Sequence, residues 1–458
     1  MTAFIDQLFA KTFTTGDETA TAFLEKLMKV SREGHLFLED PSIQDKISHL
    51  LEGDKSPLVH FESCYYLRRN FELETLIIKQ LQNLLYAQPK LTFSVKPDSD
   101  LYPEQAKALQ LAMSSSLTII TGGPGCGKTY LANKIIETLL LKMPNAHIIA
   151  TAPTGKAASR FQNKKITSQT LHSLLGIYET IDRQPAIKPL IADLIIVDEC
   201  SMIDLKLWSY LLSSIAPGTS VILMGDPDQL PPVEGGAIFE EFCNIKAINT
   251  VHLNKTLRSQ SSSLQQLSHF VKHGKGKEAI ELFSSTSDSD ISFLPLNKFT
   301  PNENLGSILT PFHKGPFGTQ AINEQIYSLS NAKVRPIIIT KNDYQLGLMN
   351  GDIGFIEDDI AVFNDSSFAS SLLYSYDLAW AISIHKSQGS EFDHVCILLP
   401  ENSELFGRKL LYTAITRAKK SVTIFGDSKT FLQITSQITH PRSNLTKRFS
   451  KYSHLTLK

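Results

Sequence analysis

One eight-residue segment carries the strongest chemical signal in the sequence. It reads Gly122-Gly-Pro-Gly-Cys-Gly-Lys-Thr129, follows the apolar run LTIIT and precedes the helix-like stretch LANKIIETLLL. In such a strand–loop–helix setting, glycines let consecutive backbone N–H groups turn towards phosphate oxygens at the positive end of the helix. Lys128 is placed to reach the β- and γ-phosphates of ATP, and the Thr129 hydroxyl to bind Mg²⁺. The segment predicts a phosphate cradle built from Gly122, Gly123, Pro124, Gly125, Cys126 and Gly127; a glycine-rich turn without a ligand is the alternative.

Two adjacent acids follow another apolar run, LIIV, at 194–197. Carboxylates at the end of a buried strand are costly unless they are used. Asp198 suits a Mg²⁺ ligand and Glu199 a base that polarises an attacking water. Two solvated acids at a strand end are the alternative, but the position 70 residues after Lys128 favours a nucleotide site.

Three further side chains could complete such a site. Gln229 lies in GDPDQLPPV (225–233), just past an apolar run, where an amide could sense the γ-phosphate. Arg258 and Arg417 lie in the second half of the chain, Arg417 at the start of an expected helix, and each could act as an arginine finger. A single arginine is more often a solvated surface charge, so spacing alone does not assign either one.

Two loops rich in small polar groups could hold a nucleic-acid backbone. The segment SIHKSQGSEF (383–392) precedes an apolar run and offers hydroxyl and backbone N–H donors, and APTGK (152–156) follows one. Ordinary loops at strand ends have the same composition. A lone histidine such as His172 or His385 is more often structural than functional.

The strands and helices that must position these residues are predicted from short apolar runs, which alternate with stretches of helical spacing. The runs lie at 117–122, 147–153, 194–199, 220–226, 307–312, 394–400 and 421–427. Fully apolar strands that alternate with helices predict an α/β fold with parallel sheets covered on both faces. A different pattern at 333–378, with Asn350-Gly351, predicts a small insertion of antiparallel strands with a turn at the Asn-Gly pair. Helical spacing at 19–30 and 73–86 predicts a helical N-terminal unit. The predicted domains are 1–95, 96–250 and 251–458.

Composition limits what the chain can be. Its 458 residues carry 45 basic and 46 acidic side chains, so a nucleic-acid site must be a local groove or depend on a basic partner. The five cysteines are scattered without a CxxC pair, which argues against a disulfide scaffold or a zinc ribbon. No apolar run is long enough for a membrane span, and the first residues do not resemble a secretory signal. We therefore expect a cytoplasmic protein that needs no membrane.

Taken together and in order, these segments resemble superfamily 1 DNA helicases over about residues 101–430. The motifs are a glutamine motif at Gln105, the phosphate loop, APTGKAA (152–158), TLHSLLG (170–176), IIVDECSM (195–202), GDPDQLPPV, the Arg258 segment, AISIHKSQGSEFD (381–393) and LLYTAITRAK (410–419). Within that superfamily, IHKSQGSEF, YTAITRAK and LGLMNGDIGF (346–355) resemble the RecD family, the α subunits of exodeoxyribonuclease V. REGHLFLED (32–40) and PLVHFESCYYLRR (57–69) resemble the partner-facing domain of that family.

The resemblance implies two RecA-like domains with ATP and Mg²⁺ between them and an SH3-like β insertion. It implies that Gln105 reads adenine and that Arg258 and Arg417 are the catalytic arginines. It also implies that residues of the matching loops contact single-stranded DNA: Thr154, His172, His385 and Ser387. The expected activity is ATP-driven 5′→3′ movement at a duplex end, in a heterotrimer with RecB-like and RecC-like subunits that supply the nuclease.

Three alternatives remain at this stage. They are a stand-alone superfamily 1 helicase, a scaffold subunit with a degraded ATP site, and a phosphate-loop kinase or switch that binds no DNA. The intact lysine, the paired acids and both arginines argue against the scaffold, and the second α/β block argues against the kinase. Stimulation of ATP turnover by DNA separates these possibilities, because only a motor needs DNA to accelerate hydrolysis.

Overall fold

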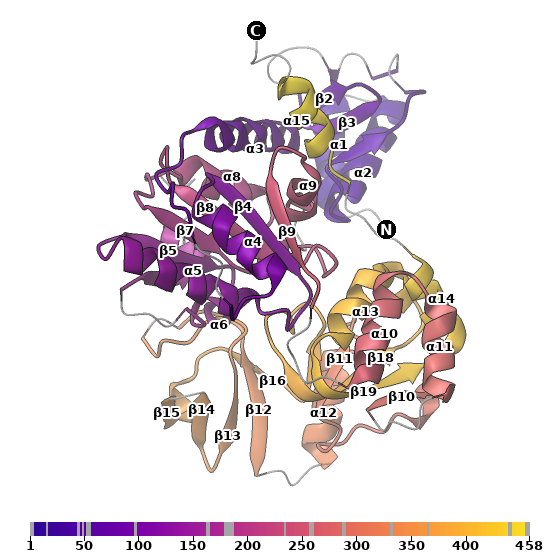
Figure 1. The fold of residues 1–458 in the computed structure, drawn as a ribbon. Coiled ribbons are helices and arrows are strands. Elements are labelled where there is room, and N and C mark those ends of the chain that lie inside the picture. Colours follow the sequence, from indigo (N-terminus) through magenta and orange to yellow (C-terminus); the bar gives the residue numbers. More distant parts are fainter. Residues whose placement is uncertain are drawn as a thin grey trace.

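The computed structural model describes the chain apart from a set of short segments and the two ends (Figure 1). The residues outside the description are 1–3, 15–16, 44–45, 48–49, 52–55, 96–98, 162–164, 178–186, 233–234, 256–260, 286–289, 330–332, 344, 364–365, 438–441 and 454–458.

Domain 1 is built on a six-stranded parallel sheet with the strand order β6-β5-β7-β8-β4-β9. Its strands are β4 (Leu117–Gly122), β5 (Ile148–Ala152), β6 (Thr167–Thr170), β7 (Leu194–Val197), β8 (Ser220–Gly225) and β9 (Asn249–Leu253). Four of them coincide with apolar runs, as predicted. The other two, β6 and β9, were not predicted, because TSQT has no apolar residue and NTVHL has only two.

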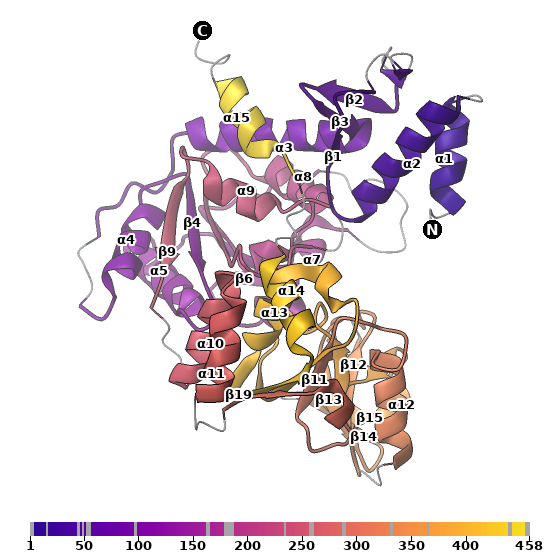
Figure 2. The same ribbon diagram turned by 90° about the vertical axis from the view of Figure 1, so that its right-hand side faces the viewer.

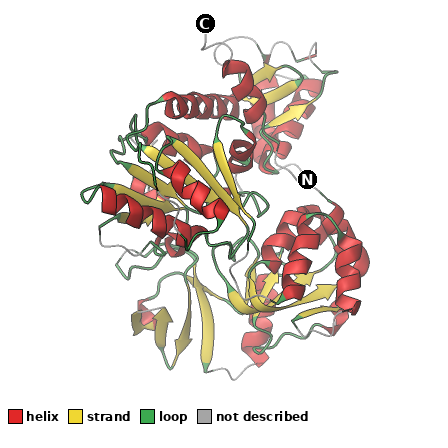
Figure 3. Cartoon of the chain, viewed as in Figure 1, coloured by secondary structure: helices red, strands yellow, loops and turns green. Residues whose placement is uncertain are grey.

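Both faces of this sheet are covered, which explains why its interior strands β5, β7, β8 and β4 are mostly apolar. Leu194 and Ile196 pack with α4 (Pro103–Ala112) and α5 (Lys128–Lys142). Ile195 and Val197 point the other way, into a core shared with α3 (Arg68–Tyr86), α8 (Leu205–Ser214) and α9 (Ile238–Asn244). Figure 3 shows helices on both sides of the strands. The short helices α6 (Gly155–Ala158) and α7 (Leu171–Leu175) follow β5 and β6.

Domain 2 has a five-stranded parallel sheet in the order β10-β19-β18-β11-β17. The strands are β10 (Ile291–Leu294), β11 (Ser307–Thr310), β17 (Ala381–Ser383), β18 (Phe392–Leu399) and β19 (Ala418–Gly426). The helices α10 (Ser262–Lys272), α11 (Gly276–Ser285), α13 (Gly407–Ile415) and α14 (Ser428–Ser436) pack on one face, and α12 (Thr319–Leu329) on the other. The prediction of an α/β fold with parallel sheets is confirmed.

An antiparallel sheet interrupts domain 2 between α12 and β17. Its strands are β12 (Val334–Ile339), β13 (Ile353–Glu357), β14 (Ile360–Phe363), β15 (Ser366–Ala369) and β16 (Tyr376–Leu378), in the order β15-β14-β13-β12-β16. Gly351 has the left-handed φ of 92° that favours glycine, at the turn before β13. The tight hairpin turn, however, is formed by Asp358 and Asp359, both with positive φ, between β13 and β14.

The N-terminal region combines the expected helices with a sheet that the sequence analysis missed. The helices are α1 (Phe4–Thr14), α2 (Glu18–Arg32) and α3. Between α2 and α3 lies an antiparallel sheet of β1 (Phe37–Glu39), β2 (Leu58–Phe61) and β3 (Cys64–Leu67). Strands of three or four residues are too short to show a clear alternation.

The last described helix, α15 (Leu445–Ser453), returns from domain 2 to the N-terminal region and packs against α3 and α9 (Figures 1 and 2). Arg448 is fully buried there, forms an ion pair with the fully buried Glu74, and lies 3.7 Å above the ring of Phe71. Asn444 Nδ2 donates to the Tyr66 hydroxyl at 2.8 Å. Residues from opposite ends of the chain therefore share one core.

Candidate functional site

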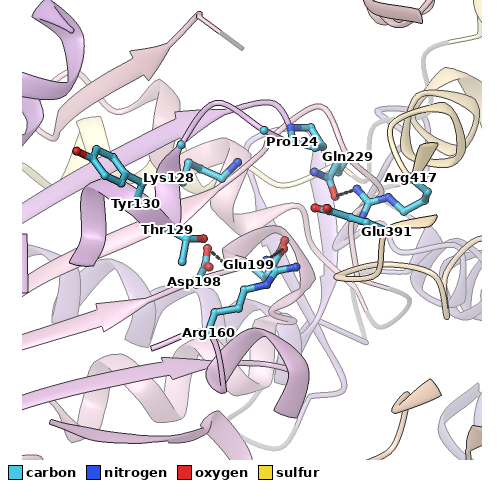
Figure 4. Close-up of a pocket in the computed structure, with 12 residues that line it drawn as sticks. Pro124, Lys128, Thr129, Tyr130, Arg160, Asp198, Glu199, Gln229, Glu391 and Arg417 are labelled. Carbon is cyan, nitrogen blue, oxygen red and sulfur yellow. Dashed lines mark hydrogen bonds and ion pairs between the residues drawn. The ribbon is translucent and has the colours of Figure 1, made fainter. Parts of the chain in front are cut away.

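A cavity of about 340 Å³ lies where the carboxyl ends of β4, β7 and β8 meet domain 2 (Figure 4). Most of the residues predicted to bind ATP line it together, although they come from distant parts of the sequence. Its lining consists of Pro124, Gly125, Gly127, Lys128, Thr129, Tyr130, Arg160, Asp198, Glu199, Gln229, Glu391 and Arg417. The remaining loop residues Gly122, Gly123 and Cys126 line an adjoining cavity of about 680 Å³ that extends to α10.

The phosphate loop runs from the end of β4 to the start of α5 and has the backbone that a cradle needs. Gly125 and Gly127 have φ of 79° and 80°, which side chains disfavour. A Cβ on Gly122 would lie 2.8 Å from the carbonyl oxygen of Leu253. The Lys128 ammonium donates to the carbonyls of Gly122 and Gly123 at 2.6 and 3.1 Å, and therefore lies directly over the loop.

Asp198 and Glu199 lie at the end of β7, facing the phosphate loop. Asp198 is almost fully buried, and its Oδ1 accepts the N–H of Glu199 at 2.8 Å. Burial, and then the negative charge of Glu199, raises the pKa of Asp198 to about 6, whereas the Lys128 charge opposes this rise. Glu199 has the positive φ of 52°, a strained backbone for a side chain of this size.

The donor set fits a Mg²⁺ ion carried by a nucleotide. The Thr129 hydroxyl and the Asp198 carboxylate lie close together on one side of the loop (Figure 4), and both are hard oxygen ligands. Among the described residues, no group of three or more His, Cys, Asp or Glu side chains could hold a metal alone. This is expected for a site where phosphate oxygens and water complete the shell.

Gln229 and Arg417 join the two domains at the edge of this cavity. Arg417 Nη2 donates to Gln229 Oε1 at 3.0 Å, between residues 188 positions apart. Gln229 in turn donates to Asp226 at 3.2 Å, and Arg417 donates to the carbonyls of Thr413 and Ser390. Arg417 is only 3% exposed, which excludes the surface-charge alternative.

The expected place of Arg417 at the start of a helix is wrong. α13 ends at Ile415, and Arg417 precedes β19. The apolar residues that suggested a helix belong to the segment before the arginine. Arg417 lies in the turn between α13 and β19, from which its guanidinium reaches Gln229 of domain 1.

One residue assigned by resemblance, Gln105, does not line this cavity, and another, Arg258, cannot be placed. Gln105 is buried at the start of α4, where its Oε1 accepts the N–H of Tyr102 at 3.2 Å, and it lines neither cavity. Its observed contact is a helix cap. Arg258 lies outside the described residues.

The residues suggested for DNA binding follow the carboxyl ends of strands at or next to a sheet edge. Thr154 follows β5 and caps α6, His172 lies exposed on α7 after β6, and His385 follows β17. Ser387 is different: it is fully buried, and its hydroxyl donates to the carbonyl of Ile384 at 2.7 Å. The side chain of Ser387 is therefore a support within its loop rather than a DNA contact.

Arg160 and Glu391 also line the cavity, and the sequence analysis missed both. Arg160 Nη1 lies 3.6 Å from Glu199 Oε1. Neither residue has a distinguishing spacing. Arg160 comes from the loop after α6 in domain 1 and Glu391 from domain 2, so only the tertiary fold brings them to one cavity.

Two parallel α/β domains with a phosphate loop in one and a buried arginine from the other define the class of motor ATPases with RecA-like domains. Family models match at residues 100–288 (AAA domain) and 378–425 (UvrD-like helicase C-terminal domain). The chain is 31% identical to "RecBCD enzyme subunit RecD" of Mycolicibacterium smegmatis, over 82% of this chain and 80% of that protein. It belongs to the RecD family and is an ATP-dependent DNA helicase.

Other relatives agree. The identity is 28% to the protein of the same name from Haemophilus influenzae, over 86% of this chain and 81% of that one. It is 29% to "ATP-dependent RecD2 DNA helicase" of Deinococcus radiodurans, over 81% of this chain and 57% of that one. A solved Pif1 helicase structure on forked double-stranded DNA is 20% identical, with a TM-score of 0.52, over 78% of this chain and 98% of that one, which shows a shared fold. Among the described helices, none is both long and apolar enough to cross a membrane.

Proposed function

We propose that this chain moves 5′→3′ along single-stranded DNA as the RecD-like subunit of a heterotrimer with RecB-like and RecC-like chains. The assembly would act on duplex ends in recombinational repair, in the cytoplasm, with the nuclease in a partner. The names of the relatives support the assembly. The observation that carries the motor role is the hydrogen bond between Arg417 and Gln229, which joins the two domains at the phosphate cavity.

The residue roles follow from the contacts. Lys128 would neutralise the β- and γ-phosphates, Thr129 and Asp198 would hold Mg²⁺, and Glu199 would orient and polarise the attacking water. Gln229 would sense the γ-phosphate, and Arg417 would stabilise the charge that develops on it. Bound Mg²⁺ would neutralise phosphate charge. The assignments of Gln105 to adenine and of Arg258 as a second finger, and the domain limits 1–95, 96–250 and 251–458 with the insertion at 333–378, stay proposals.

A DNA path across both domains is supported by where the polar loops lie. The strand β6 is an edge of the first sheet, with β5 beside it, and β17 is an edge of the second sheet, with β11 beside it. A cavity of about 730 Å³ lies beside β17. Its lining includes the donors His313, Gln320, Asn323 and Lys386, together with Glu324, Asp377 and several apolar side chains. We place single-stranded DNA along these edges, from Thr154 and His172 to His385 and this cavity. Such a path would be independent of base sequence, because its donors suit the sugar–phosphate backbone.

The direction of movement is tested by strand displacement. Duplexes with a 5′ single-stranded overhang should be unwound in the presence of ATP, whereas duplexes with a 3′ overhang should remain paired. If DNA stimulates ATP hydrolysis but neither duplex is unwound, the chain moves along DNA without separating the strands. Absence of DNA stimulation in the assembled complex would support the scaffold alternative.

Glu199→Gln should abolish turnover while nucleotide binding survives. The change keeps the shape of the side chain but removes the base, and the loss should be at least about a hundredfold. Steady-state hydrolysis with saturating single-stranded DNA and equilibrium binding of a fluorescent ATP analogue measure the two quantities. The matched control is Glu241→Gln, which changes a carboxylate of domain 1 that hydrogen-bonds Thr446 away from the cavity. If nucleotide binding falls in step with turnover, Glu199 has a structural role instead.

The partner-facing surface is best sought on α1. Phe4, Ile5 and Leu8 expose 80%, 67% and 57% of their surface on one helix. Large apolar side chains that gather on a surface indicate an interaction site. Deleting the whole N-terminal region is a poor test, because Ile77 and Leu81 of α3 belong to the core of domain 1.

We therefore expect the double substitution Ile5→Glu and Leu8→Glu to prevent co-purification with a RecC-like chain. DNA-independent ATP binding by the chain itself should change less than twofold. The matched control replaces two exposed leucines elsewhere, Leu141→Glu and Leu329→Glu, which are 84% and 76% exposed. If the α1 variant still co-purifies with the RecC-like chain and the control variant does not, the interface lies elsewhere than on α1.

A further inference from the structure

One short segment of domain 2 connects the two cavities described above. Segment 383–391 lies between the two cavities. Ser383 and Lys386, in its first half, line the 730 Å³ cavity, and its last residue, Glu391, lines the 340 Å³ cavity. Its middle is held by backbone hydrogen bonds from Ser387 to Ser383 at 3.0 Å and from Ser390 to Ser387 at 3.0 Å. These two backbone hydrogen bonds tie the ends of the segment together between the two cavities.

Domain 1 grips this segment through two basic side chains. Arg160 Nη2 donates to the carbonyl of Gly389 at 3.0 Å, and Lys156 Nζ donates to the Ser390 hydroxyl at 3.3 Å. Thr154 lies beside the same turn, because a Cβ on Gly389 would be 3.6 Å from its hydroxyl oxygen. The middle of the segment is thus the part that domain 1 contacts.

Arg160 has a second partner within domain 1. Its Nη1 lies 3.6 Å from Glu199 Oε1, and the side chains of Arg160 and Glu199 are 30% and 13% exposed. One planar guanidinium therefore spans from a backbone carbonyl of domain 2 to the carboxylate proposed as the base. Lysine cannot make two such contacts in fixed directions, since its ammonium is a single point of charge.

We propose that Arg160 is a positioning residue through which segment 383–391 sets the orientation of the Glu199 carboxylate, so that DNA held against this segment accelerates ATP hydrolysis. The inference rests on the proposed function, because it takes the 730 Å³ cavity as part of the DNA path. A misplacement of about 1 Å in a reacting group can cost about a hundredfold in rate. A small shift of Gly389, passed on by the guanidinium, is therefore sufficient to change turnover.

The competing explanation is that Arg160 only supplies positive charge beside Glu199. In that case lysine would serve as well as arginine, and loss of the charge would change hydrolysis equally with and without DNA. The ratio of the DNA-stimulated rate to the DNA-free rate separates the two explanations, because only coupling to domain 2 alters that ratio.

The test compares Arg160→Ala and Arg160→Lys with the unaltered chain in steady-state ATP hydrolysis, with and without saturating oligothymidine. The stimulation ratio should fall at least tenfold in both variants, while binding of a fluorescent ATP analogue stays within threefold. The control is Arg335→Ala, which removes an arginine of similar exposure (33%) whose partner is Asp359 in the antiparallel insertion. Its ratio should be unchanged. Thermal unfolding checks that each variant is folded, and Arg160→Lys serves if the alanine variant is not.

Three results would overturn the inference. They are an unchanged ratio in both Arg160 variants, an equal loss of the stimulated and DNA-free rates, and a ratio restored by lysine. Each of these leaves the helicase assignment intact, because the unaltered chain is still stimulated. If oligothymidine fails to stimulate the unaltered chain, the proposed motor role itself fails.

Discussion

Replacement of Arg417 by lysine is expected to lower DNA-stimulated ATP hydrolysis by at least about a thousandfold and to abolish unwinding. An arginine finger contributes roughly 10³–10⁵ in rate in related phosphoryl-transfer systems. The guanidinium makes three directed contacts, to Gln229, Thr413 and Ser390, that a lysine ammonium cannot reproduce in the same plane. Because Arg417 comes from domain 2 and Gln229 from domain 1, its loss should also uncouple hydrolysis from domain movement.

The measurement is steady-state hydrolysis with saturating single-stranded DNA, together with equilibrium binding of ATP and of DNA. Both binding constants should remain within about threefold, since the phosphate loop and the proposed DNA path stay intact. Arg408→Lys, at the other end of α13, is the matched control. A turnover loss smaller than about tenfold, equal to about 1.4 kcal/mol of barrier, would leave the trans-domain finger without support.

The second large effect is expected for Lys128→Ala, which should reduce hydrolysis by at least about a hundredfold. The Lys128 ammonium is the only cation that the phosphate loop itself supplies, and it lies over the carbonyls of Gly122 and Gly123. When ATP binds, its β- and γ-phosphates would become the partners of the Lys128 ammonium. Without this ammonium, the negative charge of the phosphates would remain uncompensated, both when ATP binds and during phosphoryl transfer.

The control for this variant is Lys142→Ala, at the far end of the same helix, α5. Its ammonium lies 5.6 Å above the ring of Phe93 and does not reach the cavity. Both variants should have similar unfolding temperatures, because the Lys128 ammonium is held by loop carbonyls rather than by the apolar core. Near-normal DNA-stimulated turnover in Lys128→Ala would contradict the assignment of the ATP site.

The parts of the site that could be predicted are those encoded by local sequence. The phosphate loop, the acids after β7 and Gln229 after β8 each follow a continuously apolar strand, and the parallel sheet brings strand ends to one edge. The same runs indicated both sheets. The predicted runs missed β6 and β9 of the first sheet, β10 and β17 of the second and the N-terminal sheet, because these strands are polar or very short.

Contacts made by tertiary approach could not be predicted in this way. Arg160 reaches Gly389 only because domain 2 lies against this part of domain 1, and it reaches Glu199 only through the fold of domain 1; nothing in its neighbourhood along the chain distinguishes it. Ser387 has the residue type expected of a DNA contact, yet its hydroxyl turns inward to Ile384. Residue type indicates what a side chain can bind, whereas burial decides whether it is available.

The return of α15 to the N-terminal region has a consequence for the order in which the chain is made. On the ribosome, residues 442–453 emerge only after the whole of domain 2, whereas Glu74 and Phe71, against which Arg448 packs, emerge early. Domains generally fold as they emerge, starting from the N-terminal side. Until α15 arrives, the Glu74 carboxylate lacks its Arg448 partner, and the apolar surface that Leu445 and Phe449 cover stays open to water. The N-terminal region is therefore completed last, so nascent chains that stop before α15 should expose this surface to chaperones even though both motor domains have been synthesised.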